Sequence, residues 1–216
     1  TPIKSSAASD VYKRQVLIVI IVVIAVGAVD SGVMNKLEHL GRMVPEVLNS
    51  DDVLATYKER NVTAGMVTYW QEVEVMTYSA DGTIHTEKPS KKEVVDRVLR
   101  SLILLDEAEQ AGLTATDEQV NAAIAEQKSI AEEYPEIREQ LEEYWEAAGM
   151  TEETYWTLLQ QSFYEELTIA NLQAILMTEY EEAGMTEEEA KAAYEAYKNG
   201  LIETHQDQIT YYLDAS

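Results

Sequence analysis

Cysteine is absent from the 216-residue chain, and glycine, proline and phenylalanine are scarce, with nine, four and one copies. Without cysteine, disulfide bonds, thiolate metal sites and cysteine nucleophiles are excluded. Most of the glycine and proline residues stand at the apparent ends of helices, a distribution that favours an α-rich fold. The aromatic content comes mainly from 13 tyrosines and three tryptophans.

Basic residues are also few, since 16 Lys and Arg stand against 40 Asp and Glu and the formal net charge is −24. A chain this acidic repels nucleic acid and anionic lipid headgroups, so we expect no nucleic-acid partner. The simplest interpretation is that the acids solvate the outer faces of helices. Binding of polycations or calcium is the alternative, but the sequence has no D-x-[DN]-x-[DN]-G loop.

No catalytic motif stands out. The three histidines, at positions 39, 85 and 205, are scattered along the chain. The sequence has no H-E-x-x-H zinc motif, phosphate-binding loop, dinucleotide fingerprint or G-x-S-x-G nucleophile turn. Neighbouring acids such as Glu132 and Glu133 point in different directions on a helix and are poorly placed to share a proton. We therefore expect no catalytic residue, no metal site and no cofactor.

One uninterrupted apolar run, VLIVIIVVIAVGAV at residues 16–29, follows Lys13 and Arg14. Its length is short of the about 20 residues that a membrane-spanning helix needs, and it suits a signal peptide. A signal-anchor and a buried core segment are the alternatives. We expect an extracytoplasmic bacterial protein, either secreted or membrane-anchored. Residues 1–15 resemble translated sequencing-adapter read-through, or else form a cytoplasmic tail.

Beyond this run, apolar residues at helical spacing over 33–48 predict a helix, and residues 30–50 are interpreted as a linker helix. The domain itself is expected over 51–216. The predicted fold class is mainly α, preceded by the hydrophobic helix, with a small two-stranded β element from the N- and C-terminal ends. Its strands are expected near 53–57 and 208–213, and its longest helix near 151–183.

The four-residue phrase Ala-Gly-[Leu/Met]-Thr occurs at 111–114, 148–151 and 183–186. Each copy predicts a helix end, where glycine takes the left-handed conformation, followed by a new helix that the threonine caps. The spacing is close to that of helical-hairpin repeats. However, the intervals lack the Trp, Tyr and Pro pattern of tetratricopeptide repeats. We interpret the three copies as hinges of one non-repetitive domain.

Four stretches carry a family resemblance. DVLATYKERNVT at 52–63 is similar to the opening strand and turn of the SurA/PrsA-type chaperone domain, although Lys58-Glu59-Arg60 replaces the usual Asn-Gly-Glu. VVDRVLRSLILLDEAEQAGLTATDEQV at 94–120 resembles the next helix and turn of that domain nearly position for position. AGMTEETY at 148–155 and DQITYYL at 207–213 resemble later parts of it.

The resemblance implies a SurA N-like helical module that binds unfolded or extended polypeptides outside the cytoplasm. Many relatives add a parvulin-type prolyl isomerase domain, whose activity we do not carry over to this chain. The leading hypothesis is an ATP-independent chaperone-like module. Its partners would be unfolded or nascent exported proteins and, through residues 16–29, the membrane. The alternatives are a membrane-anchored structural adaptor that docks one defined partner, and a truncated prolyl isomerase.

A surface that holds extended clients should be apolar, adaptable and partly exposed, which suits methionine and aromatic side chains. The alternative for each candidate is an ordinary place in the core. Because successive helix residues do not face one core equally well, at least one of Tyr155 and Trp156 should line a groove. The client-binding candidates are Tyr69, Trp70, Tyr144, Trp145, Met150, Tyr155, Trp156 and Phe163.

Overall fold

The computed structural model describes residues 31–75 and 87–213, with side chains from residue 37 onward. The predicted hydrophobic helix at 16–29 and the tail at 1–15 lie outside the described residues. Within the described ranges, no helix combines the length and the apolar character that a membrane crossing requires.

The described residues form seven α-helices and one small antiparallel sheet, which confirms the mainly α fold class. The strands are β1 (Val53–Tyr57), β2 (Arg60–Thr63) and β3 (Ile209–Tyr211). The helices are α3 (Ser31–Asn49), α4 (Ala64–Glu74), α5 (Lys91–Gln110), α6 (Asp117–Glu133), α7 (Pro135–Ala148), α8 (Glu152–Glu182) and α9 (Glu187–Thr204).

The sheet has three strands in the order β2-β1-β3, one more than the two predicted. Strand β3 pairs with β1 as expected, with Tyr57 opposite Ile209. The additional strand arises because the turn after β1 closes a hairpin without glycine. Lys58 takes a φ of +52° there, and the chain returns along β1 with Arg60 opposite Tyr57. The backbone cost of that left-handed lysine is about 1 kcal/mol, which the strand pairing offsets.

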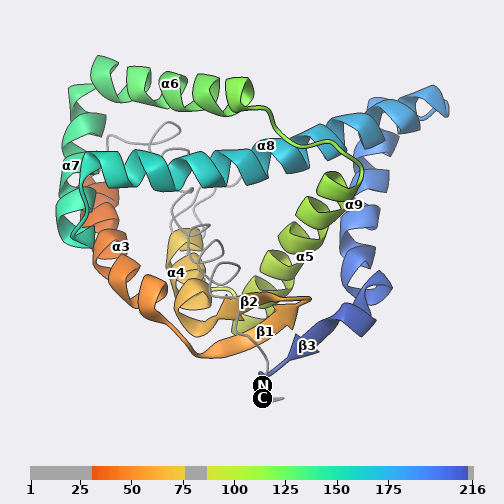
Figure 1. The fold of residues 1–216 in the computed structure, drawn as a ribbon, viewed down its shortest axis with the longest axis horizontal. Helices are drawn as coiled ribbons and strands as arrows, with labels where there is room; N and C mark the ends of the chain where they lie inside the picture. Colours follow the sequence, from red (N-terminus) through yellow and green to blue (C-terminus); the bar gives the residue numbers. More distant parts are fainter. Residues whose placement is uncertain (1–30, 76–86, 214–216) are drawn as a thin grey trace.

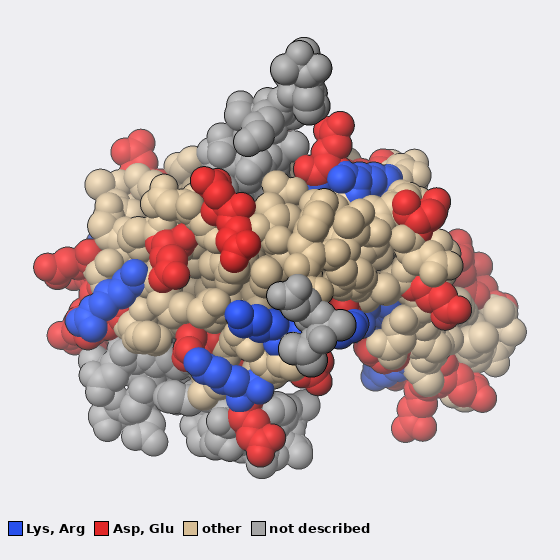
Figure 2. All heavy atoms as spheres, turned by 90° about the horizontal axis from the view of Figure 1, so that it is seen from below, with Lys and Arg blue, Asp and Glu red and all other residues tan. Residues whose placement is uncertain are grey.

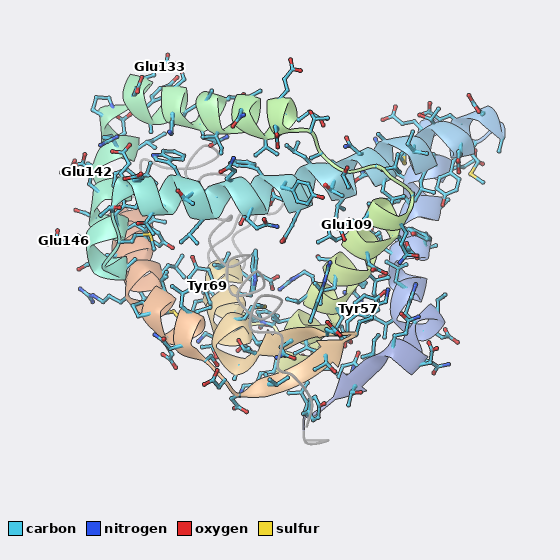
Figure 3. All side chains as sticks on the ribbon, viewed as in Figure 1. Tyr57, Tyr69, Glu109, Glu133, Glu142 and Glu146 are labelled. Atoms are coloured by element: carbon cyan, nitrogen blue, oxygen red, sulfur yellow. The ribbon has the colours of Figure 1, made fainter. Side chains whose placement is uncertain are left out.

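The sheet lies at one edge of the molecule, next to α4 and α5 (Figure 1). Helices α6 and α8 run side by side along the edge far from the sheet, and α7 joins them at one end (Figure 1). Helix α5 leads from the sheet towards α8, and α9 brings the chain back to the sheet, where β3 closes the fold (Figure 1). Acidic side chains such as Glu133, Glu142 and Glu146 project outward from α6 and α7 (Figure 3).

The three repeated phrases form the helix ends that the sequence predicts. Gly112, Gly149 and Gly184 have φ values of +71°, +64° and +92°. In each copy the amide after the glycine donates to the carbonyl five residues earlier, as Met150 does to Trp145 at 2.9 Å, which is the Schellman arrangement. Thr151 and Thr186 cap the following helices, but in the first copy the cap is Thr116 rather than Thr114.

Helix α3, which we interpreted as a linker, packs as part of the same core as the predicted domain. Leu37, Leu40, Val44 and Val47 are all at most 4 % exposed. Pro45 lies inside the helix without ending it. Gly41 allows α3 to approach α7 closely, because a Cβ atom at this position would lie 2.7 Å from the backbone oxygen of Tyr144.

We expect Gly41→Ala to lower the free energy of unfolding by about 1–2 kcal/mol, because overpacking outweighs the gain in helix propensity. The matched control is Gly200→Ala in α9, where no atom lies within 4 Å of the added Cβ. That substitution should raise the free energy of unfolding by about 0.5–1 kcal/mol. Urea unfolding of both variants checks this, and stabilisation by both would show that α3 does not pack closely on α7.

Candidate functional site

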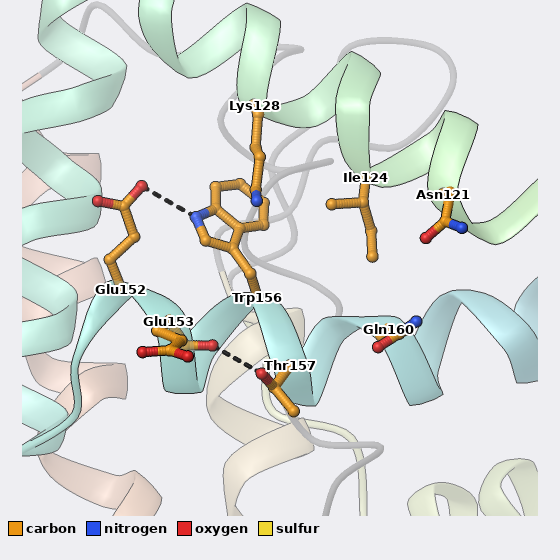
Figure 4. A pocket seen from close by; sticks show the side chains of 8 residues that line it. All are labelled: Asn121, Ile124, Lys128, Glu152, Glu153, Trp156, Thr157 and Gln160. Carbon is orange, nitrogen blue, oxygen red and sulfur yellow. Dashed lines mark hydrogen bonds between the residues drawn. The ribbon is translucent and has the colours of Figure 1, made fainter.

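An open groove of about 580 Å³ lies between α6 and α8 (Figure 4), and we call it the α6–α8 groove. The two helices bound its long sides. The residues that line it are Asn121, Ile124 and Lys128 from α6 and Glu152, Glu153, Trp156, Thr157 and Gln160 from α8.

The groove exists because α6 packs mainly through its ends. The buried residues of α6 are Val120 near its start and Ala131 near its finish. Between them, Ile124 is half-buried and Asn121 and Lys128 are exposed. Alanines occupy positions 122, 123 and 125, so the middle of the helix carries little bulk to fill the space above α8. The side chains of α6 therefore leave an amphipathic channel.

Trp156 forms the apolar wall of the groove and is held in a fixed orientation. Its indole Nε1 donates to Glu152 Oε1 at 3.0 Å. The Lys128 ammonium lies 5.3 Å from the centre of the indole ring, on its groove side (Figure 4). The ring of Tyr155 packs edge-on at 5.0 Å between centroids. As a result only 6 % of Trp156 is exposed, although it lines the groove.

Glu152 is itself held by Arg138, which links α7 to α8 at one end of the groove. The guanidinium donates to both carboxylate oxygens, at 3.0 and 2.8 Å, and also to Glu142 at 2.7 Å. It lies 5.1 Å from the centre of the Trp145 ring. The hydrogen bonds from Arg138 and Trp156 hold the pKa of Glu152 below its usual value.

The lowered pKa of Glu152 gives a prediction for acid. A carboxylate whose pKa is lower in the folded state stabilises the fold above its unfolded-state pKa, and this contribution disappears as the pH falls through the folded-state pKa. We expect Glu152→Gln to destabilise the protein at pH 7 by up to about 1 kcal/mol, because the pair is half-exposed. The difference from the parent should shrink below pH 4.5, the ordinary value for this carboxyl. Urea unfolding from pH 7 to pH 3 measures it, and a constant difference would contradict the assignment.

The structure divides the eight predicted client-binding residues into two groups. Tyr69, Tyr144 and Tyr155 have no exposed surface, and Trp145 is 5 % exposed. The three tyrosines come from α4, α7 and α8. The Tyr69 and Tyr144 hydroxyls interact with each other, whereas the Tyr155 hydroxyl has no hydrogen-bond partner among the described residues. Burial raises the pKa of each hydroxyl. This group stabilises the core and offers no contact surface in this conformation.

The second group lines cavities or is only partly buried, and its members lie in separate places. Trp156 lines the α6–α8 groove, whereas Trp70 lines a smaller cavity of about 160 Å³ with Arg97 and Ile169. Met150 and Phe163 are partly buried against the core. The candidates therefore do not form one continuous surface, and their role in client binding stays a prediction.

Sequence reasoning missed the groove partners of Trp156. On α6, Asn121, Ile124 and Lys128 have the three- and four-residue spacing of one helix face, as do Glu153, Trp156, Thr157 and Gln160 on α8. The periodicity could have identified each face. Whether the two faces meet depends on the angle of α7, which joins α6 to α8. The spacing of residues along each helix does not predict that angle.

The described side chains contain no group of three or more His, Asp or Glu residues placed to hold a metal ion. The family described as SurA-like N-terminal domain matches residues 6–169. The chain belongs to this family. The matched residues include both walls of the groove. The match ends within α8, so α9 and β3 lie beyond it. Comparisons with curated proteins and with solved structures gave no match.

Proposed function

We propose that the chain is an ATP-independent, chaperone-like module that binds unfolded or extended polypeptides during export and folding. The observation that carries the proposal is the α6–α8 groove, in which Trp156 is combined with hydrogen-bonding side chains. Membership of the SurA-like family supports a chaperone-type role. No catalytic step is part of the proposal.

The dimensions and lining of the groove suit weak contacts with extended chains. From Asn121 to Lys128, α6 rises by about 10 Å, which equals about three residues of extended polypeptide. Asn121, Gln160 and Thr157 are exposed and offer donors and acceptors that fit a peptide backbone of any sequence. A contact this short favours rapid exchange, which allows release without nucleotide hydrolysis.

We further propose that the module works outside the cytoplasm, secreted or held at the membrane. The apolar run at 16–29 behind Lys13 and Arg14 supports this placement. The proposed partners are accordingly unfolded or nascent exported proteins.

The direct test is suppression of aggregation, measured by light scattering with several unrelated unfolding clients. We expect the chain to delay aggregation of all of them. Thr157→Trp, which fills the groove, should reduce the protection several-fold. Thr178→Trp is the matched control, because Thr178 is also exposed on α8 and donates its hydroxyl four residues back, as Thr157 does. If no client is protected, the proposal fails and an adaptor for one defined partner is favoured.

A further inference from the structure

The α6–α8 groove is occupied in part by a cation of the protein itself, the ammonium of Lys128. The Lys128 ammonium lies 5.3 Å from the Trp156 ring centre, within the range of an attractive cation–π contact. The same indole donates to the Glu152 carboxylate, which adds a negative charge close to the ring. Lys128 is exposed, and besides the ring its ammonium interacts electrostatically with Glu152. The indole is therefore covered by a long, flexible side chain.

The helices that form and join the walls of the groove are strongly acidic. Residues 117–182, which contain α6, α7 and α8, carry 17 acidic side chains and only two basic ones, Lys128 and Arg138. Both bases lie over tryptophan rings. By contrast, the face that carries the sheet shows basic side chains among the acidic ones (Figure 2), and several are paired, as Lys92 is with Asp96.

The groove also contains a carboxylate that is free to receive a second cation. Glu153 lines the groove beside Trp156 and Thr157, and it is exposed. Within the described residues it has no ion pair and accepts a hydrogen bond only through its backbone oxygen, from Thr157. An incoming lysine or arginine would thus meet an aromatic face and a carboxylate in one small space.

We propose that the groove selects client segments that carry a lysine or arginine next to apolar residues, and that Lys128 is the resident cation such a client replaces. This inference rests on the proposed function. The client's cation takes the place of the Lys128 ammonium over Trp156, close to Glu153, while its apolar neighbours contact Ile124 and the uncovered edge of the indole. Lys128 swings into solvent and leaves its place over the indole to the cation of the client.

The experiment uses the full chain and three fluorescein-labelled ten-residue peptides. The peptides are identical, apolar and uncharged except for a central Arg, Gln or Glu, and fluorescence anisotropy gives each Kd. The parent chain should bind the Arg peptide about three-fold more tightly than the Gln peptide, and the Glu peptide least tightly. Lys128→Gln should tighten binding of the Arg peptide by a further factor of about three, and leave binding of the Gln peptide nearly unchanged.

The matched control is Lys191→Gln, which changes the net charge equally but lies on α9 in an exposed pair with Glu187. It should change no Kd by more than about 1.5-fold, because salt screens charges beyond about 10 Å. Equal effects of the two lysine substitutions would overturn the resident-cation role. Equal binding of the Arg and Gln peptides would overturn the selection and leave the proposed function standing. If no peptide binds the parent or Lys128→Gln, the proposed function fails as well.

Discussion

Replacing Tyr155 with alanine should lower the free energy of unfolding by about 3–5 kcal/mol, whereas Tyr155→Phe should leave it unchanged or raise it by up to about 1 kcal/mol. Tyr155 has no exposed surface and packs against three aromatic rings. Its ring therefore contributes a large buried area that nothing else in the fold replaces.

Tyr155→Phe should not lower the free energy of unfolding, because it removes only the hydroxyl group. The Tyr155 oxygen has no hydrogen-bond partner among the described residues, so the folded state desolvates it without compensation. Removing that oxygen keeps the ring and removes the cost. Urea unfolding followed by far-ultraviolet circular dichroism separates the two variants. A loss of more than 1 kcal/mol in Tyr155→Phe would show that the hydroxyl is satisfied after all.

The second large effect concerns α3, the helix that the sequence led us to interpret as a linker. We expect Leu37→Ala to cost about 2–5 kcal/mol of unfolding free energy, as a buried leucine does in a well-packed core. Leu37 is 1 % exposed and belongs to the same cluster as residues of α4, α5 and α8.

The control for this substitution is Arg42→Ala on the outer face of the same helix. Arg42 is mostly exposed and, among the residues that the structure describes, pairs only with Glu38, four residues earlier. Its loss should therefore change stability by less than about 0.5 kcal/mol. If Leu37→Ala is as mild as Arg42→Ala, residues 31–49 form a separate helix rather than part of the domain.

Local signals in the sequence account for most of the helices. Ser90 with Glu93, Thr116 with Gln119 and Thr186 with Glu189 form capping boxes, and each defines a helix start. The three glycines at helix ends are equally local, since the left-handed conformation follows from the residue type. The return strand of the hairpin was not counted in the predicted sheet, because Lys58 rather than glycine takes the positive φ at its turn.

Helix α8 shows why the burial of side chains was harder to predict than the positions of the helices. Tyr155 and Trp156 point in different directions, as helix geometry requires, but both are buried because α8 is covered on two sides. Tyr155 packs against α7, while Trp156 lies beneath Lys128 of α6. Periodicity identifies one buried face of a helix and gives no information about a second helix that covers another face. For the same reason the groove partners on α6 could not be inferred from the sequence.

The proposed function depends most on the α6–α8 groove as the surface that contacts clients. Because the chain has no cysteine, single-cysteine variants can carry a benzophenone cross-linker at one chosen place. The decisive measurement compares photo-cross-linking of an unfolded client from Thr157→Cys, at the groove, and from Thr178→Cys, on the same helix. We predict strong cross-linking from position 157 and little from position 178. Equal yields from both, or a higher yield from position 178, would contradict the account.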